Sequence, residues 1–307
     1  MKKGFLTGVF SIIRFQNLVI ISLSLYLARY AIITPILDYT GYASSINNSN
    51  YSLLVVATLF IAAAGYVIND YFDTGIDTIN KPGKNKTGIL ITRQGAIVLY
   101  VLLNLAGFSI IWHFGFLQGI RYPLLLFIFS AGLLYFYSSS YKKMFLVGNL
   151  VVSFLTALTI GLSVLFDHQA LLSEPVKLLI SAYALFAFMM TLIREIIKDC
   201  EDVEGDSVFG ATTLAVVAGT KTAHVIASLL TAILLGSIVY IQVLQAQWQN
   251  LVAFLYTVVL IQLPLLVLMI RGLLSKTKKD ENWNSRLAKL IMVTGIGSML
   301  VFQLSSN

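Results

Sequence analysis

Two stretches of this sequence gather acidic side chains at a repeated spacing. The first is Asn69-Asp-Tyr-Phe-Asp-Thr-Gly-Ile-Asp77, and the second runs from Glu195 to Asp206. Carboxylates stand at offsets of 0, 3 and 7 in both, namely at Asp70, Asp73 and Asp77 and again at Asp199, Asp202 and Asp206. On a helix these offsets place three side chains within an arc of about 60°, which Asn69 extends to about 100°. Each stretch therefore predicts a carboxylate-bearing helix face, unless Gly205 ends the second helix before Asp206.

Carboxylates grouped in this way favour a cation between them. Like charges on one helix face repel by a few tenths of a kcal/mol per pair. Oxygen ligands suit Mg²⁺, which keeps several waters and joins one or two carboxylates to the phosphates of a substrate. The sequence therefore indicates a Mg²⁺ and polyphosphate site. Two alternatives remain open, a solvated acidic surface and the ion pathway of a transporter.

The elements that position these stretches are membrane helices. The 307 residues are 58% hydrophobic and 11% charged, with a mean hydropathy of +0.84, whereas a soluble domain carries about 25% charge. This composition excludes a large soluble domain, and we expect one integral membrane domain over 1–307. Nine apolar segments of membrane-spanning length predict nine helices, at 9–33, 52–72, 95–115, 122–138, 145–166, 176–199, 224–244, 251–270 and 286–304.

Basic residues indicate the orientation of these helices. If the chain changes sides after each helix, all 21 Lys and Arg except Arg29, Arg121 and Lys177 fall on the side of the N-terminus. The positive-inside rule makes this side the cytoplasm, so the acidic stretches should face the cytoplasm from the cell membrane. The net charge of +7 is explained by these short loops, and we expect no nucleic-acid partner.

The motifs resemble those of the UbiA superfamily of intramembrane prenyltransferases. The likeness rests on the two acidic stretches, each ending a membrane helix, and on Tyr137-Ser-Ser-Ser-Tyr-Lys142 followed by Gly148-Asn149. It covers nearly the whole chain. The resemblance implies an all-α bundle of nine transmembrane helices around a lipid-accessible cavity, where Mg²⁺ ions hold the diphosphate of a prenyl donor.

The resemblance also implies roles for single residues. Asn69, Asp73, Asp202 and Asp206 would ligate Mg²⁺, with Asp70, Asp77 and Asp199 as further ligands or their supporting partners, and Asp73, Asp202 and Asp206 would be the catalytic residues. Lys142 would bind the diphosphate, unless it only anchors the helix end. Further phosphate partners on the same side are Lys81, Arg194 and Lys198.

Loss of the diphosphate would leave a prenyl cation, which aromatic faces attract. Tyr66, Tyr71, Tyr135 and Tyr137 lie near the right depth for this task, although each could instead be a packing or interfacial aromatic residue. Arg14 and Asn17 in the first segment resemble a family position near the cavity, or they anchor the membrane end.

The acceptor is the more open question. The stretch from Arg194 to Asp206, with Gly210 and Thr213, looks closest to the branch that alkylates geranylgeranylglyceryl phosphate, a lipid acceptor. The segment Asn80–Gly88 departs from the family pattern, so an aromatic acceptor remains the alternative. Outside these motifs, Cys200 is expected to be a neutral spacer, the three histidines show no metal-ligand spacing, and Asp280 and Glu281 should be solvated.

Overall fold

Helices account for the architecture of this chain. The computed structural model describes residues 8–80, 91–245 and 250–306. In these ranges nine helices are long and apolar enough to cross a membrane, and they follow the nine apolar segments of the sequence in order. The prediction of an all-α chain with nine membrane helices is confirmed.

The helices form two compact units. One consists of Met1–Leu25 and Ser45–Met144, and the other of Tyr26–Ser44 and Phe145–Asn307. The first membrane helix contributes to both, because its parts α2 (Phe15–Leu27), η1 (Ala28–Ile33) and α3 (Thr34–Tyr39) extend across Leu25. The single domain expected over 1–307 stays a prediction.

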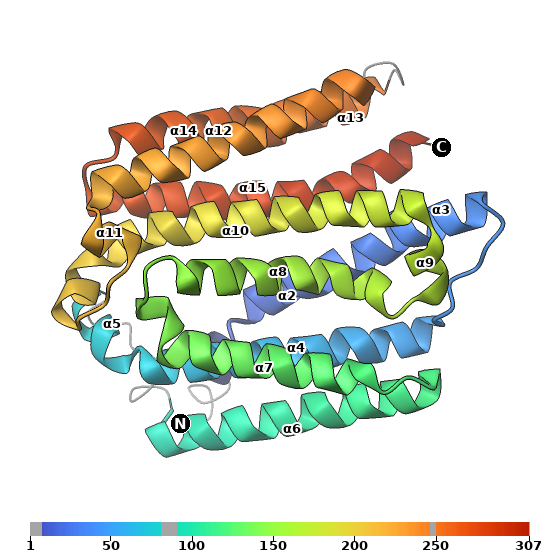
Figure 1. Ribbon diagram of the computed structural model, residues 1–307, viewed down its shortest axis with the longest axis horizontal. Helices are drawn as coiled ribbons and strands as arrows, with labels where there is room; N and C mark the ends of the chain where they lie inside the picture. Colours follow the sequence, from blue (N-terminus) through green and yellow to red (C-terminus); the bar gives the residue numbers. More distant parts are fainter. Residues whose placement is uncertain (1–7, 81–90, 246–249, 307) are drawn as a thin grey trace. The chain divides into compact units, whose positions relative to one another are not determined.

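In the first unit, α4 (Asn48–Phe72) packs against both α6 (Arg93–Gln118) and α7 (Tyr122–Ser139), as Figure 1 shows. Small residues make these contacts close, as is usual between membrane helices. A Cβ atom at Gly65 would lie 2.9 Å from Leu134 Cδ1, and one at Gly107 would lie 2.8 Å from Ile61 Cδ1. The short helices α5 (Thr74–Asn80) and η2 (Tyr141–Lys143) follow α4 and α7.

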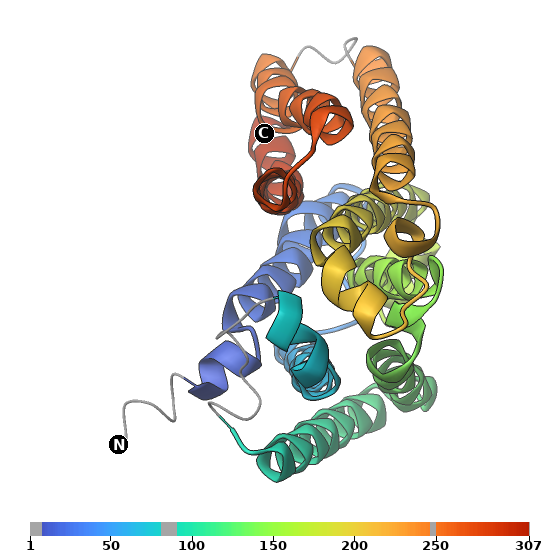
Figure 2. The same cartoon turned by 90° about the vertical axis from the view of Figure 1, so that its left-hand side faces the viewer.

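The second unit is built on α10 (Glu174–Val208). This helix packs against α8 (Val147–Leu165), α12 (Thr220–Gln245) and α15 (Lys278–Ser306), while α14 (Leu263–Leu274) packs against α12 and α15. Figure 2 shows these helices from their ends. The core between them includes the fully buried Ile193, Leu265 and Ile291. The remaining elements of the unit are α9 (His168–Leu172), α11 (Leu214–Val217), α13 (Leu251–Thr257) and η4 (Val258–Gln262).

Helix ends differ from the sequence-based expectation at the acidic stretches. α10 continues through the buried Gly205 to Val208, so Asp206 is still on the helix. α4 ends at Phe72, and Asp73 caps it. The backbone N–H of Asp77 nevertheless donates to the Asp73 carbonyl at 2.9 Å, so the helical hydrogen-bond pattern continues into α5.

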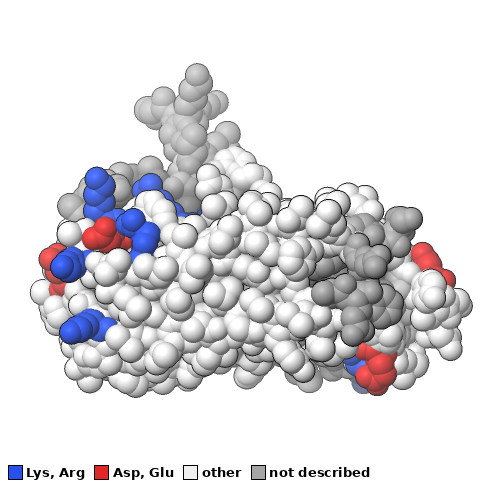
Figure 3. All heavy atoms as spheres, turned by 90° about the horizontal axis from the view of Figure 1, so that it is seen from above, with Lys and Arg blue, Asp and Glu red and all other residues white. Residues whose placement is uncertain are grey.

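Charged side chains keep to the helix ends. On the face drawn in Figure 3, the Lys, Arg, Asp and Glu side chains of the described residues gather toward the ends of the helices, and other residues form the surface between. Many apolar side chains between the helix ends are exposed, including Leu102, Trp112 and Leu125. Such a surface is stable in a bilayer, where hydrocarbon covers it.

We predict that Gly115→Ala destabilises the protein. The end of α6 turns through Gly119 in the left-handed region (φ 67°), and Ile120 N–H donates to the Gly115 carbonyl. A Cβ at Gly115 would lie 2.7 Å from the Ile120 carbonyl oxygen, a clash with backbone that should cost about 1–3 kcal/mol. Thermal unfolding in detergent measures this. Gly161→Ala is the control because its Cβ would meet nothing within 4 Å; equal melting temperatures of Gly115→Ala and wild type would contradict the prediction.

Candidate active site

Asp73 is the centre of a polar cluster in the first unit. Asn69, one helical turn earlier, donates from Nδ2 to Asp73 Oδ2 at 2.7 Å. The ammonium of Lys142 contacts the other carboxylate oxygen, Oδ1. Lys142 lies in η2, the single turn after α7, where its side chain is 13% exposed. The structure therefore brings together three residues expected at the site, and we call Asn69, Asp73 and Lys142 the Asp73 cluster.

Asp70 has a different partner from Asp73. Arg14 Nη2 donates to the buried Asp70 Oδ1 at 2.7 Å, and its guanidinium lies 5.1 Å from the ring centre of Tyr66. Burial alone would lower the pKa of Arg14, but the charge and hydrogen bond of Asp70, with contributions from Tyr66 and Tyr137, raise the pKa above its ordinary value. Arg14 therefore stays charged, and Asp70 is compensated by an arginine within its own unit.

The backbone at Arg14 supports a specific role for this residue. Arg14 has a φ of 51°, a left-handed conformation that is uncommon for a residue with a side chain. The turn is closed by the backbone N–H of Asn17, which donates to the Arg14 carbonyl at 2.7 Å. This conformation costs free energy and persists where contacts hold it, and here Asp70 and Tyr66 supply those contacts.

The four expected tyrosines have separate surroundings. Arg14 covers one face of Tyr66, and Arg93 lies 4.8 Å from the ring centre of Tyr71. Tyr135 packs against Phe72 and Tyr100, whereas Tyr137 acts electrostatically on Arg14. A ring face under a guanidinium is already engaged with a cation. The proposed contact of these rings with a prenyl cation stays a prediction.

The second acidic stretch lies on α10 in the second unit. Because the helix is continuous, the offsets 0, 3 and 7 place Asp199, Asp202 and Asp206 within an arc of about 60°. Asn149, in the first turn of α8, donates from Nδ2 to Asp199 Oδ2 at 2.8 Å. Asn149 was part of the resemblance without an assigned role, and the structure makes it the residue that orients Asp199.

Two basic residues expected to bind phosphate are paired with Glu195. Arg194 Nη1 donates to Glu195 Oε1 at 2.7 Å, and Lys198 Nζ lies 3.8 Å from Glu195 Oε2. Glu195 itself is buried. The spacing of Glu195 and Lys198, i and i+3 on a helix, is a sequence signal for such a pair. Glu195 thus holds two cations beside the acidic face of α10.

Polar contacts attach the start of α15 to α10 and to α12. Asn282 donates to Glu201 Oε1 at 2.9 Å, one residue before Asp202. Next to it, Glu281 is buried and pairs with His224 Nε2 at 2.8 Å, and Ser275 donates to the same carboxylate oxygen at 2.6 Å. The expectation that Glu281 is solvated is therefore wrong. Its partners come from α12 and from the turn after α14, which the sequence does not reveal.

The donor set of the two stretches fits a hard cation. Asn69, Asp73, Asp199 and Asp202 all offer oxygen, the ligand that Mg²⁺ prefers. Over residues 8–80, 91–245 and 250–306, no three His, Cys, Asp or Glu side chains form a group that could hold a metal ion. A metal would therefore need oxygen atoms from water and phosphate, which is how Mg²⁺ usually binds. Lys81, a predicted phosphate partner, lies outside the described residues.

Comparison with known proteins decides the family. Residues 19–292 match the model of the UbiA prenyltransferase family. The chain belongs to this family. It is an integral membrane prenyltransferase, with nine candidate membrane helices in the described part of the chain.

Several relatives of this UbiA-family chain share one name. A digeranylgeranylglyceryl phosphate synthase from Methanothermobacter thermautotrophicus is 33% identical over 84% of this chain and 86% of its own length. The protein of the same name from Sulfolobus acidocaldarius is also 33% identical, over 83% of this chain and 84% of its own. The similarity therefore extends over nearly the full length of both relatives.

Solved structures share the fold. One, described as giving insights into digeranylgeranylglyceryl phosphate synthase in membranes, has a TM-score of 0.67 at 22% identity and covers 99% of both chains. A UbiA homologue from Archaeoglobus fulgidus bound to GPP and Mg²⁺ has a TM-score of 0.56 at 15% identity, covering 95% of this chain and 99% of its own. The predicted UbiA-type architecture is thereby confirmed.

We predict that Arg14→Leu lowers the thermal stability of the protein, because it leaves the buried carboxylate of Asp70 without its cation. Loss of one partner of such a pair should cost about 1–3 kcal/mol, and Arg14 is partly exposed, which favours the lower end. The measurement is a double-mutant cycle of melting temperatures. Asp70→Leu added to Arg14→Leu should restore part of the loss, whereas simple addition of the two single effects would contradict the pairing.

Proposed function

We propose that this chain transfers a geranylgeranyl group from geranylgeranyl diphosphate to geranylgeranylglyceryl phosphate. In this reaction the allylic C–O bond breaks and the diphosphate leaves with the electron pair. The hydroxyl oxygen of the acceptor bonds to the prenyl carbon and releases its proton. The observation that carries the proposal is the Asp73 cluster, which joins a carboxylate, an amide and an ammonium at the end of α4 in a member of a prenyltransferase family.

Lys142 has a part in binding the donor. Before substrate arrives, its ammonium compensates the charge of Asp73. A diphosphate offers Lys142 a more highly charged partner, and Lys is a flexible point charge that can turn to it. Asp73, still oriented by Asn69, then becomes available to a cation. Mg²⁺, when bound, supplies Lewis-acid stabilisation of the charge that develops on the leaving group.

The second stretch offers cation-binding groups of its own. Asn149 fixes the rotamer of Asp199 by donating a hydrogen bond to its Oδ2. Asp202 and Asp206 continue along the same face of α10 and are the proposed Mg²⁺ ligands there. We place this site at the cytoplasmic side of the cell membrane, with the N-terminus in the cytoplasm, because the basic residues gather on that side of the helices.

The phosphate of the acceptor needs cationic partners. Arg194 and Lys198 share the charge of one carboxylate, Glu195, so the three groups together keep a net positive charge. Such a group suits a phosphorylated glycerol better than an uncharged ring. The names of the relatives from Methanothermobacter and Sulfolobus support the same lipid acceptor. An aromatic acceptor is the competing possibility that experiment must separate.

We expect Asp73→Asn and Asp202→Asn each to lower prenyl transfer by about a hundredfold or more, because each removes a carboxylate that would hold Mg²⁺ against the leaving diphosphate. Glu204→Gln is the matched control, since Glu204 is an exposed carboxylate two residues from Asp202. Binding of Mn²⁺ in the presence of a prenyl diphosphate analogue, followed by paramagnetic resonance, should weaken in both Asp variants and not in the control. Full turnover in either Asp variant would refute the metal assignment.

The acceptor can be identified directly. Purified protein in lipid nanodiscs is given labelled geranylgeranyl diphosphate with either geranylgeranylglyceryl phosphate or a hydroxylated aromatic acid. We expect label in the glycerol lipid. We also expect Arg194→Leu to raise the KM for this acceptor more than it changes kcat, since the lost contact with the acceptor phosphate is made equally in the ground state and in the transition state. Labelling of the aromatic acid alone would overturn the proposed acceptor while leaving the reaction class intact.

A further inference from the structure

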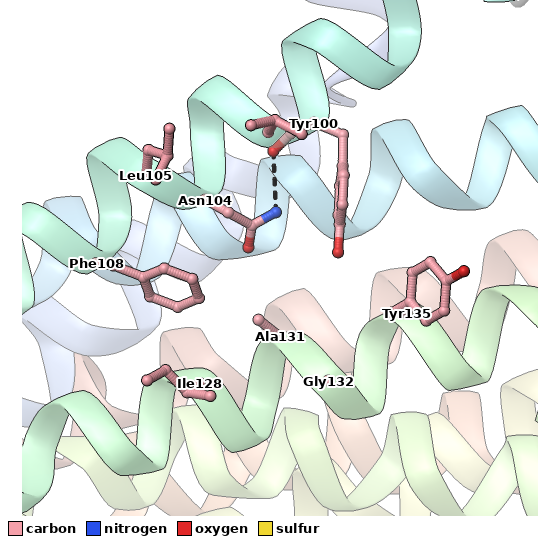
Figure 4. Close-up of a pocket in the computed structure, with 9 residues that line it drawn as sticks. Tyr100, Asn104, Leu105, Phe108, Ile128, Ala131, Gly132 and Tyr135 are labelled. Atoms are coloured by element: carbon pink, nitrogen blue, oxygen red, sulfur yellow. Dashed lines mark hydrogen bonds between the residues drawn. The ribbon is translucent and has the colours of Figure 1, made fainter.

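A groove in the first unit lies apart from the acidic residues. It has a volume of about 540 Å³ and runs between α6 and α7, with walls that include Tyr100, Asn104 and Phe108 on α6 and Ile128, Gly132 and Tyr135 on α7. Figure 4 shows these side chains around the space between the two helices. The volume is within the range of small-molecule binding sites, about 300–1,000 Å³. The groove is thus large enough for a ligand.

The position along the helix places this groove inside the bilayer. Asn104 is eleven residues after Arg93, the first residue of α6, which corresponds to about 16 Å along the axis. Since the hydrocarbon core is about 30 Å thick, Asn104 lies near the middle of the membrane. Leu105 and Ile128, which also line the groove, are exposed on the surface. The medium that reaches the groove is therefore hydrocarbon.

Asn104 leaves a polar atom unsatisfied at this depth. Its Nδ2 donates to the Tyr100 carbonyl at 2.9 Å, and its side chain is among the buried polar groups, with 8% of the residue exposed. The amide oxygen Oδ1 accepts no hydrogen bond from the residues that the structure describes. Figure 4 shows this oxygen directed toward the space between α6 and α7. An unpaired amide oxygen costs free energy, and more so in hydrocarbon than near water.

The lining determines what kind of ligand could satisfy this oxygen. All nine lining residues are uncharged, and the polar groups among them are the amide of Asn104 and the phenols of Tyr100 and Tyr135. A phosphorylated headgroup would find no cation here. A hydroxyl group can donate to Asn104 Oδ1, and a hydrocarbon chain can pack on Phe108 and Ile128. The chemistry of the groove therefore matches a neutral lipid with one hydroxyl.

We propose that the α6–α7 groove binds an uncharged long-chain alcohol of the bilayer, whose hydroxyl donates to Asn104 Oδ1. This site is distinct from the Asp73 cluster and does not depend on the proposed transfer reaction. The two are connected by packing, because Tyr135 in the groove wall contacts Phe72, the residue before Asp73, with ring centres 5.8 Å apart. A bound lipid would thus contact Tyr135, which packs against the end of α4 that carries the first acidic stretch.

The test is photolabelling of the purified full-length chain in detergent, without diphosphate or metal. The probe is hexadecanol with a diazirine in its chain, and the comparison probe is the same chain without the hydroxyl. We expect labelled peptides from 100–108 and 128–135, with about tenfold more labelling by the alcohol, the factor that one net hydrogen bond of about 1.4 kcal/mol gives. Unlabelled hexadecanol should compete.

Two variants change the groove in different ways. Gly132→Leu fills it, and the new Cβ would meet nothing within 4 Å, so the helix should accommodate the substitution. Its control is Gly236→Leu on α12, where the new Cβ would also meet nothing. Asn104→Leu removes the acceptor, and its control is Gln242→Leu on α12. We expect about tenfold less labelling in Gly132→Leu and loss of the preference for the alcohol in Asn104→Leu.

The proposal is overturned by any of three results. The first is labelling spread evenly over all the membrane helices of wild type, and the second is equal labelling by the two probes. The third is wild-type labelling of the groove peptides in folded Gly132→Leu protein. If Gly132→Leu does not fold, competition by unlabelled hexadecanol on wild type decides instead: displaced label supports the site, and label that is not displaced rejects it.

Discussion

A carboxyl group at the end of an apolar helix needs an opposite charge or a hydrogen-bond donor, and this constraint applies to both acidic stretches. An uncompensated buried charge costs several kcal/mol. In the first unit the partners are cations: Arg14 pairs with Asp70, and Lys142 contacts Asp73. In the second unit Asp199 accepts a hydrogen bond from the neutral amide of Asn149. An amide orients a carboxyl group but brings no opposite charge, whereas Asp73 is paired with the ammonium of Lys142.

The two ion pairs of the first unit differ in the type of cation and in how that cation is held. Arg14 is planar, holds a strained backbone turn and lies over Tyr66, so its contact with Asp70 is rigid. Lys142 lies on a single turn of helix and ends in a compact ammonium that can change partner. In the proposed reaction, the Arg14–Asp70 pair would keep the helix end in place while Lys142 exchanges Asp73 for the diphosphate.

Much of the helical framework was predictable because a membrane helix depends on composition over about 20 residues, which any sequence window measures. Pairing between distant residues is not visible in this way. Arg14 and Asp70 are 56 residues apart, and the burial of Glu281 depends on His224 and Ser275 from other elements. The sequence left open whether the helix continues past Gly205, because glycine weakens a helix interior by about 1 kcal/mol. In the structure Gly205 is buried and α10 continues to Val208.

Other polar side chains within the membrane helices explain why the amide oxygen of Asn104 lacks a hydrogen-bond donor in the described part of the chain. Several serine and threonine hydroxyls donate to a carbonyl of their own helix, as Thr58 does to Leu54 and Ser153 to Asn149, although the buried hydroxyl of Thr191 on α10 has no such partner among the residues that the structure describes. Asn104 satisfies its Nδ2 in the same way. An amide, however, also carries an acceptor, and inside a helix every nearby N–H is already used. The backbone of the helix can therefore satisfy a hydroxyl but not both groups of an amide, and the remaining oxygen requires a donor from a side chain or from a ligand.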